Sequence, residues 1–154
     1  MSNNQEILAA EQQHLAAVSR VNYFDLVIDH GQGAIVTDAD GRDYIDLLAS
    51  ASATNVGHAH PKVVAAITQQ AQKLIQYTPA YFANTTTAQL VQRLTALTPG
   101  TFEKQALFGN SGSDANDAMI KLARAYTGRS YIVSFTGAYH GSTYGAMSIS
   151  GVSL

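Results

Sequence analysis

The sequence has no cysteine and no tryptophan, and only 13% of its 154 residues are charged. Without cysteine the chain can form neither a disulfide bond nor a thiolate metal site. The net charge is −2, and no block of lysine and arginine is present, so nucleic acid is not an expected partner. The low charged fraction predicts that some faces of this chain are buried against further polypeptide.

Long hydrophobic runs are also missing. No stretch approaches the roughly 20 apolar residues that cross a bilayer. Residues 1–15 carry Glu6 and Glu11 in place of the apolar core of a signal peptide. We therefore expect a cytoplasmic protein that does not associate with membranes. The apolar fraction of 46% is typical of a soluble globular protein.

Residue patterns predict a mixed α/β fold. Apolar residues at helical spacing after Pro61 indicate an amphipathic helix, and Asp40-Gly41 is typical of a hairpin turn. The expected helices span about residues 5–19, 61–74, 88–97 and 114–127, with a further one starting near 143. The expected strands span 26–28, 34–38, 44–48, 105–108 and 130–135. Alternation of strand and helix after residue 100 predicts a parallel sheet with a ligand at the carboxyl ends of its strands.

Two segments that follow predicted strands carry the candidate chemistry. Ser111, Gly112 and Ser113 precede a predicted helix, and Tyr139-His140 follow the next strand. A helix N-terminus has unpaired N–H groups and partial positive charge, so it can hold a phosphate. Glycine lets the anion approach the backbone, and the serine hydroxyls can donate to it or cap the helix. Because both segments follow strands, they are expected at the same edge of the sheet.

Each of these features also has a simpler interpretation. A Ser-Gly-Ser turn before a helix can be only a cap, and it is neither a Walker loop nor a dinucleotide fingerprint. Asp117 and Lys121 are expected to form an i,i+4 ion pair on the helix surface. His58 and His60 lack an evident third ligand, so a role in a turn is favoured over a metal site. No Gly-x-Ser-x-Gly elbow is present, which argues against a hydrolase.

In combination, these segments resemble the class III aminotransferases, a pyridoxal-phosphate family that includes the 4-aminobutyrate aminotransferases. The similarity extends from about Tyr23 to the last residue. It rests on the family's Phe-x-Asn-Ser-Gly-Ser, Ala-Arg-x-Tyr-Thr-Gly-Arg, Gly-x-Tyr-His-Gly and Gly-His-x-His-Pro motifs. In this sequence they are Phe108–Ala115 (with the two residues that follow the serine included), Ala123–Arg129, Gly137–Gly141 and Gly57–Pro61.

The resemblance implies the N-terminal part of a fold type I pyridoxal-phosphate transferase. Residues 1–60 would form an N-terminal helix and a small antiparallel lobe, and residues 61–154 the start of the large cofactor-binding α/β domain. Pyridoxal 5'-phosphate would be the cofactor, with its phosphate on Ser111, Gly112 and Ser113. Tyr139 would stack on its ring and His140 would support that face. The complete protein would be a homodimer that acts on an amino acid and a 2-oxo acid.

Two departures from the family pattern leave the reaction open. Asp114 replaces the usual glutamate, and the family's glycine-rich segment is Ala49–Val56 here. The second departure, with Tyr77–Phe82, resembles the amino-acid 2-epimerase branch, the isoleucine 2-epimerase type. Transamination is the favoured interpretation, and epimerisation or racemisation of an amino acid is the alternative.

The lysine that would bind the cofactor covalently has no counterpart in this chain. By the family pattern it lies well beyond Leu154, and the chain's own lysines do not match it: Lys62, Lys73, Lys104 and Lys121. We therefore expect an N-terminal fragment that is inactive by itself. A non-catalytic truncated remnant is the remaining alternative.

Overall fold

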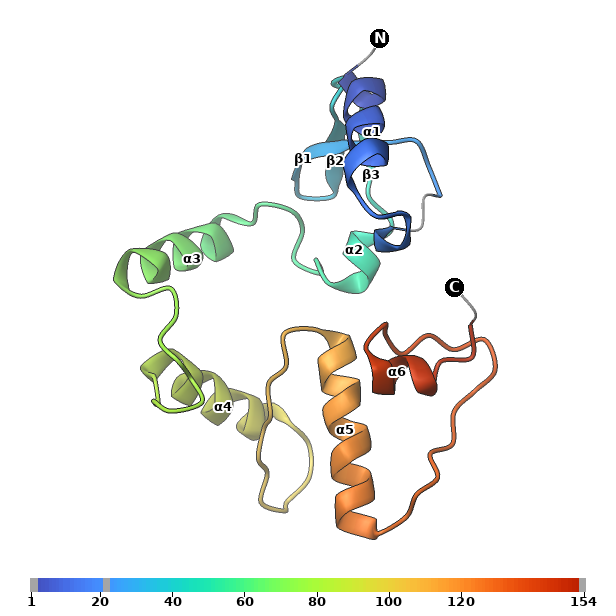
Figure 1. The fold of residues 1–154 in the computed structure, drawn as a ribbon. Helices are drawn as coiled ribbons and strands as arrows, with labels where there is room; N and C mark the ends of the chain where they lie inside the picture. The colour runs from blue at the N-terminus through green and yellow to red at the C-terminus, as the bar shows by residue number, and fades with distance from the viewer. Residues whose placement is uncertain (1–2, 21–22, 153–154) are drawn as a thin grey trace. The chain divides into compact units, whose positions relative to one another are not determined.

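The computed structural model describes residues 3–20 and 23–152. The chain divides into two compact units, Met1–Tyr77 and Thr78–Leu154. Figure 1 shows the order of the elements along the chain. The division expected from sequence, at residue 60, stays a prediction about the domains of the complete protein.

The first unit begins with a helix and a small antiparallel sheet. Helix α1 spans Asn3–His14, and a short 3₁₀ turn, η1, follows at Ala17–Ser19. Strands β1 (Ile28–Gln32), β2 (Ile35–Asp38) and β3 (Asp43–Ile45) pair in the order β1-β2-β3, both pairs antiparallel. The sheet confirms the expected antiparallel lobe, although β1 lies two residues further along the chain than predicted. The first helix is shorter than the predicted span of 5–19.

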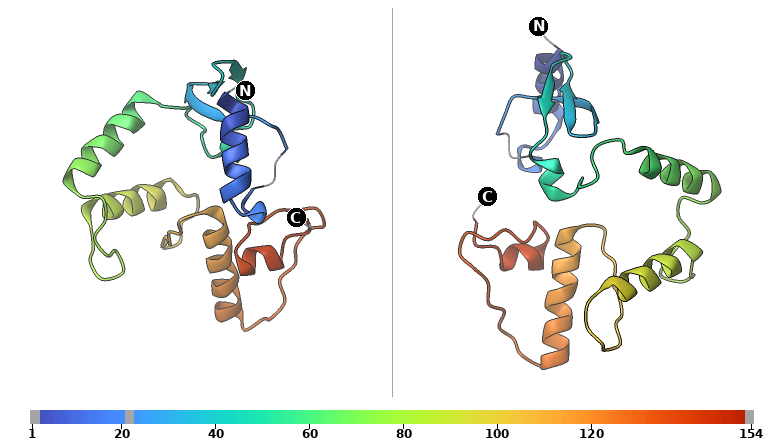
Figure 2. Two further views of the ribbon diagram at one scale, coloured as in Figure 1. Left: turned by 45° about the horizontal axis from the view of Figure 1, so that its top comes forward. Right: turned by 180° about the vertical axis from the view of Figure 1, so that it is seen from behind.

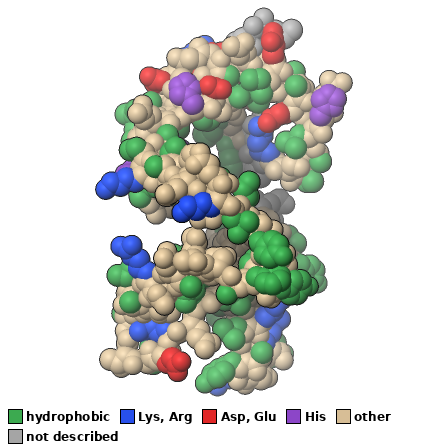
Figure 3. Space-filling model, turned by 90° about the vertical axis from the view of Figure 1, so that its left-hand side faces the viewer, with side chains coloured by type: hydrophobic (Ala, Val, Ile, Leu, Met, Phe, Trp, Pro, Cys, Tyr) green, Lys and Arg blue, Asp and Glu red, His purple; other side chains and the backbone are tan. Residues whose placement is uncertain are grey.

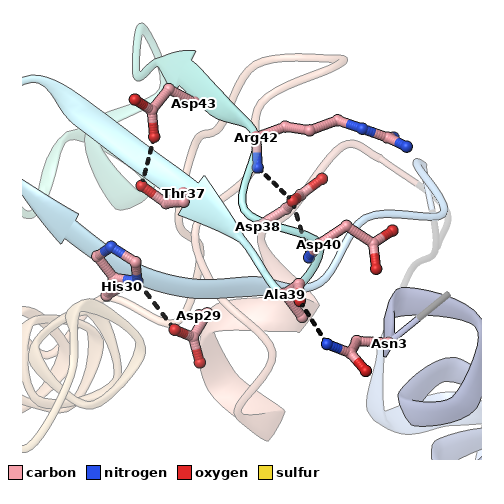
Figure 4. A network of polar contacts seen from close by, with 9 residues as sticks. All are labelled: Asn3, Asp29, His30, Thr37, Asp38, Ala39, Asp40, Arg42 and Asp43. Carbon is pink, nitrogen blue, oxygen red and sulfur yellow. Dashed lines mark hydrogen bonds and ion pairs between the residues drawn. The ribbon is translucent and has the colours of Figure 1, made fainter.

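Asp38 organises the turn between β2 and β3. Its side chain is buried, and it accepts hydrogen bonds from the backbone N–H of Asp40 at 3.0 Å and of Arg42 at 2.8 Å. The Tyr44 hydroxyl donates to it at 2.9 Å, and Asn4 Nδ2 donates at 3.1 Å. Figure 4 shows this turn together with the contact from Asn3 to Ala39. One carboxylate therefore fixes the hairpin and anchors α1 to it.

Helix α2 (Ala49–Ser52) was not predicted, and its backbone is left-handed. Its four residues have φ values between 47° and 68°, although none of them is glycine. Such a conformation costs roughly 1–2 kcal/mol per residue for L-amino acids. It begins where Asp46 accepts hydrogen bonds from the amides of Leu48 and Ala49, at 2.9 and 2.8 Å.

Two longer helices agree closely with the sequence pattern. Helix α3 (Pro61–Lys73) has its proline at the first turn, and the His60 side chain accepts from the Lys62 amide. Helix α4 (Thr85–Leu97) is capped by Asn84, whose side chain accepts from the Thr87 amide at 2.7 Å. It starts three residues before the predicted boundary, because the asparagine cap lies upstream of the apolar run.

The second unit contains the α5–α6 pair. Helix α5 spans Gly112–Thr127, and Gly128 ends it in the left-handed conformation at φ 70°. The short helix α6 (Tyr144–Ser148) contacts α5, as Figures 1 and 2 show from three directions. The helices predicted after the Ser-Gly-Ser turn and near Thr143 are thus confirmed.

The strands predicted at 105–108 and 130–135 are not present. Both segments have irregular structure. Tyr131, Val133 and Phe135 in the second segment are 80–94% exposed. A strand exists only when a neighbouring strand pairs with its N–H and C=O groups, and the described residues offer these two segments no such partner.

Few apolar side chains are buried. Among the described residues the buried apolar side chains are Leu8, Ile120 and Ala146. Figure 3 shows apolar side chains gathered on the visible surface. The described helices include none that is long and apolar enough to cross a membrane.

Candidate cofactor-binding site

The N-terminus of α5 is built by a reciprocal pair of side chains. Ser111 is the cap, with extended backbone, and its Oγ accepts a hydrogen bond from the Asp114 amide at 3.1 Å. The Asp114 carboxylate in turn accepts from the Asn110 amide at 3.1 Å. This arrangement resembles a capping box and fixes the entry of the chain into the helix. Of the two serines that could cap α5, the structure uses Ser111.

The cap leaves donors free at the helix end. The amides of Gly112 and Ser113 have no acceptor within hydrogen-bond distance among the described residues. A Cβ added to Gly112 would meet no atom within 4 Å, so the side of the helix end at Gly112 is not covered by other described residues. Two free amides, the helix dipole and this uncovered side fit a phosphate group. That Ser111, Gly112 and Ser113 hold the cofactor phosphate stays a prediction.

The segment that carries Tyr139 and His140 is tied to this same helix end. Asn116 Nδ2 donates to the His140 carbonyl at 2.6 Å, and the Ser142 amide donates to Ser113 Oγ at 3.2 Å. The Thr143 hydroxyl lies within hydrogen-bond distance of the Ser113 carbonyl and of the Asp117 carboxylate. Side-chain bonds from α5 thus bring together the two segments that sequence analysis singled out.

Close packing at Gly141 explains the glycine in this segment. Gly141 is buried and has φ 131°, a conformation that L-residues rarely adopt. A Cβ there would lie 2.7 Å from Ser113 Cβ. Gly145 is packed in a similar way in α6, where a Cβ would lie 2.9 Å from Asp117 Cγ. Both glycines let the loop and α6 approach α5.

Tyr139 directly precedes His140, whose carbonyl is held by Asn116 of α5. The Tyr139 side chain is 58% exposed, and its hydroxyl lies 2.8 Å from Ser142 Oγ. The ring face is therefore accessible while the hydroxyl is held. His140 is half-buried, and both of its backbone polar groups are bonded: the amide donates to Ser150 Oγ at 3.0 Å, and the carbonyl accepts from Asn116.

Sequence reasoning missed the residues that join the two segments. Asn116, Thr143 and Ser150 were not singled out, and Asp117 was expected to pair with Lys121. The structure instead gives Asp117 the hydroxyl of Thr143. A polar residue in a helix interior was the available signal, because asparagine forms helices less readily than alanine.

His58 and His60 take structural positions in the first unit. His58 Nε2 lies 2.6 Å from Asp46 Oδ2, and His60 caps α3. Residues 3–20 and 23–152 contain no group of three His, Asp or Glu side chains that could hold a metal ion.

Comparison with known proteins identifies the family. The family model described as "Aminotransferase class-III" matches residues 15–153. This chain belongs to the class III aminotransferase family. The comparison with solved structures agrees with this assignment. The chain superposes with a TM-score of 0.85, at 31% identity, on the taurine:2-oxoglutarate aminotransferase of Bifidobacterium kashiwanohense, which was solved in complex with PLP and glutamate. The match covers 96% of this chain and 33% of that one.

Curated relatives include enzymes of two reaction types. The isoleucine 2-epimerase of Lentilactobacillus buchneri is 59% identical over 97% of this chain and 33% of its own length. A probable 4-aminobutyrate aminotransferase of Bacillus subtilis is 43% identical over 77% of this chain and 27% of its own length. The chain thus spans about a third of the relatives that it matches. It has the fold of the N-terminal part of a pyridoxal-phosphate transferase, and pyridoxal phosphate is the cofactor of this family.

Proposed function

We propose that this chain is the N-terminal, cofactor-holding part of a class III aminotransferase that moves an amino group from an amino acid to a 2-oxo acid. The N-terminus of α5, with its amides at Gly112 and Ser113 unpaired among the described residues and the Tyr139-His140 segment tied to it, is the observation that carries the proposal. Among the residues of this chain, Ser111, Gly112 and Ser113 hold the phosphate. Tyr139 covers the ring and His140 supports that face.

When bound, pyridoxal phosphate supplies an electron sink that makes the Cα–H bond of an attached amino acid acidic. The residues of this chain bind and orient. The Gly112 and Ser113 amides hold the anion, and the Ser111 and Ser113 hydroxyls, which already accept from Asp114 and Ser142, keep their hydrogens for it. Exposed Tyr139 offers a flat face for stacking.

We propose that the complete protein is about as long as the relatives. Its further residues would supply the lysine that binds the cofactor covalently and the acidic partner of the pyridine nitrogen. We propose that this complete protein is a cytoplasmic homodimer. The exposed apolar side chains of segment 131–135 support the proposal that further polypeptide packs against this chain, because apolar surface of this kind is normally covered.

Epimerisation at Cα is the second candidate function. Two observations favour it: the 59% identity to an isoleucine 2-epimerase, and the Ala49–Ser52 segment in place of glycine-rich sequence. The comparisons support the two reactions about equally. Both would use the same phosphate and ring contacts of this chain, and they would differ in whether a proton returns to the Cα of the substrate, which epimerisation requires and transamination does not.

A single incubation separates the two reactions. The complete polypeptide is loaded with pyridoxal phosphate and given one enantiomer of a branched amino acid in heavy water, without any 2-oxo acid. An aminotransferase should stop early, because the amino group that it removes has no acceptor. Sustained inversion at Cα with deuterium incorporation would replace the aminotransferase proposal by the epimerase. A complete polypeptide that binds no pyridoxal phosphate would contradict both.

A further inference from the structure

The backbone of His140 is held on both sides by side chains from elsewhere in the second unit. Its amide donates to Ser150 Oγ at 3.0 Å, and its carbonyl accepts from Asn116 Nδ2 at 2.6 Å. Both bonds are partly buried, so water does not freely replace them. The orientation of the peptide groups on either side of His140 is therefore set by Asn116 and Ser150.

Each of these two side chains is itself fixed. Asn116 lies on α5, only four residues after Gly112, and moves with the helix end that holds the free amides. Ser150 Oγ also lies 2.9 Å from the Ala146 carbonyl at the centre of α6. Backbone bonds of 2.7 Å from Gly151 to Ala138 and of 3.2 Å from Gly137 to Gly151 close the loop around them.

Asn116 is costly for the helix itself. Asparagine forms helices less readily than alanine or leucine, and at this position its side chain makes no cap. Its amide instead leaves α5 and reaches the carbonyl of a residue 24 positions away. Because the Asn116 side chain contributes little to its own helix, we infer that its main role is to hold the His140 peptide in place.

We propose that Asn116 and Ser150 are positioning residues that fix the Tyr139-His140 face relative to the phosphate-holding end of α5. The inference rests on the proposed function, because it gives that face the task of covering the cofactor ring. The phosphate end and the ring end of the site then form one rigid arrangement. Neither residue is among those proposed to contact the cofactor.

Amide hydrogen exchange in the complete polypeptide tests the positioning directly. Asn116→Leu removes the donor without adding charge and keeps a good helix former. We expect exchange at the His140 and Ser142 amides to rise about tenfold, although neither amide bonds to Asn116. Ser150→Ala should do the same at His140, and Ser150→Thr, which keeps the hydroxyl, should restore wild-type exchange. Gln13→Leu, an exposed amide-to-leucine change on α1, is the matched control and should leave these amides unchanged.

Cofactor binding supplies the second readout. The visible circular dichroism of bound pyridoxal phosphate reports how firmly its ring is oriented. Per bound cofactor, this signal should fall severalfold in Asn116→Leu and Ser150→Ala, and it should recover in Ser150→Thr. If the Leu variant does not fold, the Ser150 pair decides alone.

The outcomes separate this inference from the proposed function. Unchanged exchange at His140 and Ser142 in Asn116→Leu overturns the positioning role. Raised exchange with an unchanged dichroism signal and affinity also overturns it, because the bonds would then be structural only. A wild-type protein that binds no pyridoxal phosphate at all contradicts the proposed function instead, whatever the exchange results.

Discussion

Nε2 of His58 lies 2.6 Å from Oδ2 of Asp46, and the other carboxylate oxygen of Asp46 accepts from the amides of Leu48 and Ala49. The His58 backbone also exchanges two hydrogen bonds with Gly33, at 2.8 and 2.9 Å. One carboxylate therefore joins the end of the hairpin, the left-handed turn of α2 and the Gly-His-x-His-Pro turn.

Replacing Asp46 should alter stability in acid. The hydrogen bond from His58, followed by those from Ala49 and Leu48, holds the pKa of Asp46 below its ordinary value. A carboxyl with a lowered pKa stabilises the fold above the unfolded value of about 3.9, and this stabilisation is lost as pH falls through the folded value. Asp46→Asn should lower the melting temperature of the complete polypeptide at neutral pH. The additional decrease in melting temperature between neutral and acidic pH should be smaller in this variant than in the wild type.

The control for this prediction is another Asp-His contact in the same unit. Asp29 Oδ2 lies 2.8 Å from His30 Nδ1, but both side chains are 65% exposed, against 12% and 23% for Asp46 and His58. Exposed pairs contribute little to stability. Asp29→Asn should therefore leave the melting temperature nearly unchanged, and equal effects of the two substitutions would contradict the role given to Asp46.

Substitution of Gly112 should weaken phosphate binding without harming the fold. A Cβ at Gly112 meets no protein atom within 4 Å, so the fold can accept it, and we expect the added methyl to crowd a phosphate held by the neighbouring amides. Gly112→Ala should keep the melting temperature of the complete polypeptide and lower its affinity for pyridoxal phosphate. Affinity for pyridoxal, which lacks the phosphate, should not change. An unchanged affinity for both would mean that the turn serves only as a cap.

Ser113→Ala should have a smaller effect on cofactor affinity than Gly112→Ala. The substitution removes one hydroxyl donor and the acceptor for the Ser142 amide, but it leaves the backbone donors in place. The expected loss of binding free energy is about 1 kcal/mol. Equilibrium titration with pyridoxal phosphate measures it, and a loss greater than that of Gly112→Ala would assign the phosphate mainly to the hydroxyl.

Tyr139 should contribute through its ring rather than its hydroxyl. The hydroxyl is engaged with Ser142 Oγ at 2.8 Å, and the ring is the exposed part. Ring stacking is worth about 0.5–1.5 kcal/mol beyond area burial, so Tyr139→Phe should keep cofactor affinity and Tyr139→Ala should weaken it. The rate of proton transfer at Cα, measured by deuterium exchange, should fall in the alanine variant only. Equal losses in both variants would show that the hydroxyl carries the effect.

The 154-residue chain expressed by itself should associate and should not catalyse. Apolar side chains such as Val133 at 92% and Leu107 at 74% exposure would be in water, and such surfaces drive association. Borohydride reduction after mixing with pyridoxal phosphate should label no unique lysine. Light scattering checks the first expectation and peptide mapping the second. A monodisperse monomer with a sharp melting transition would contradict the first.

Local sequence determined the helices and the motifs. The helix after Pro61 and the helix between Ser111 and Gly128 could be predicted because proline, cap residues and apolar spacing act within a few neighbouring residues. The hairpin around Asp40-Gly41 was predictable for the same reason. These interactions are short in sequence, so the sequence alone carries them, and the motifs that they place identify the family.

Tertiary structure decided what depends on distant partners. The segments 105–108 and 130–135 have strand-like sequences, yet a strand forms only where another strand satisfies its backbone groups. The left-handed turn of α2 was not predicted, because no local pattern of alanine and serine indicates it. The link from Asn116 to His140 spans 24 residues, and only folding shows that these two meet. Contacts of this kind depend on how the whole chain folds, and the spacing of neighbouring residues does not determine which distant residues meet.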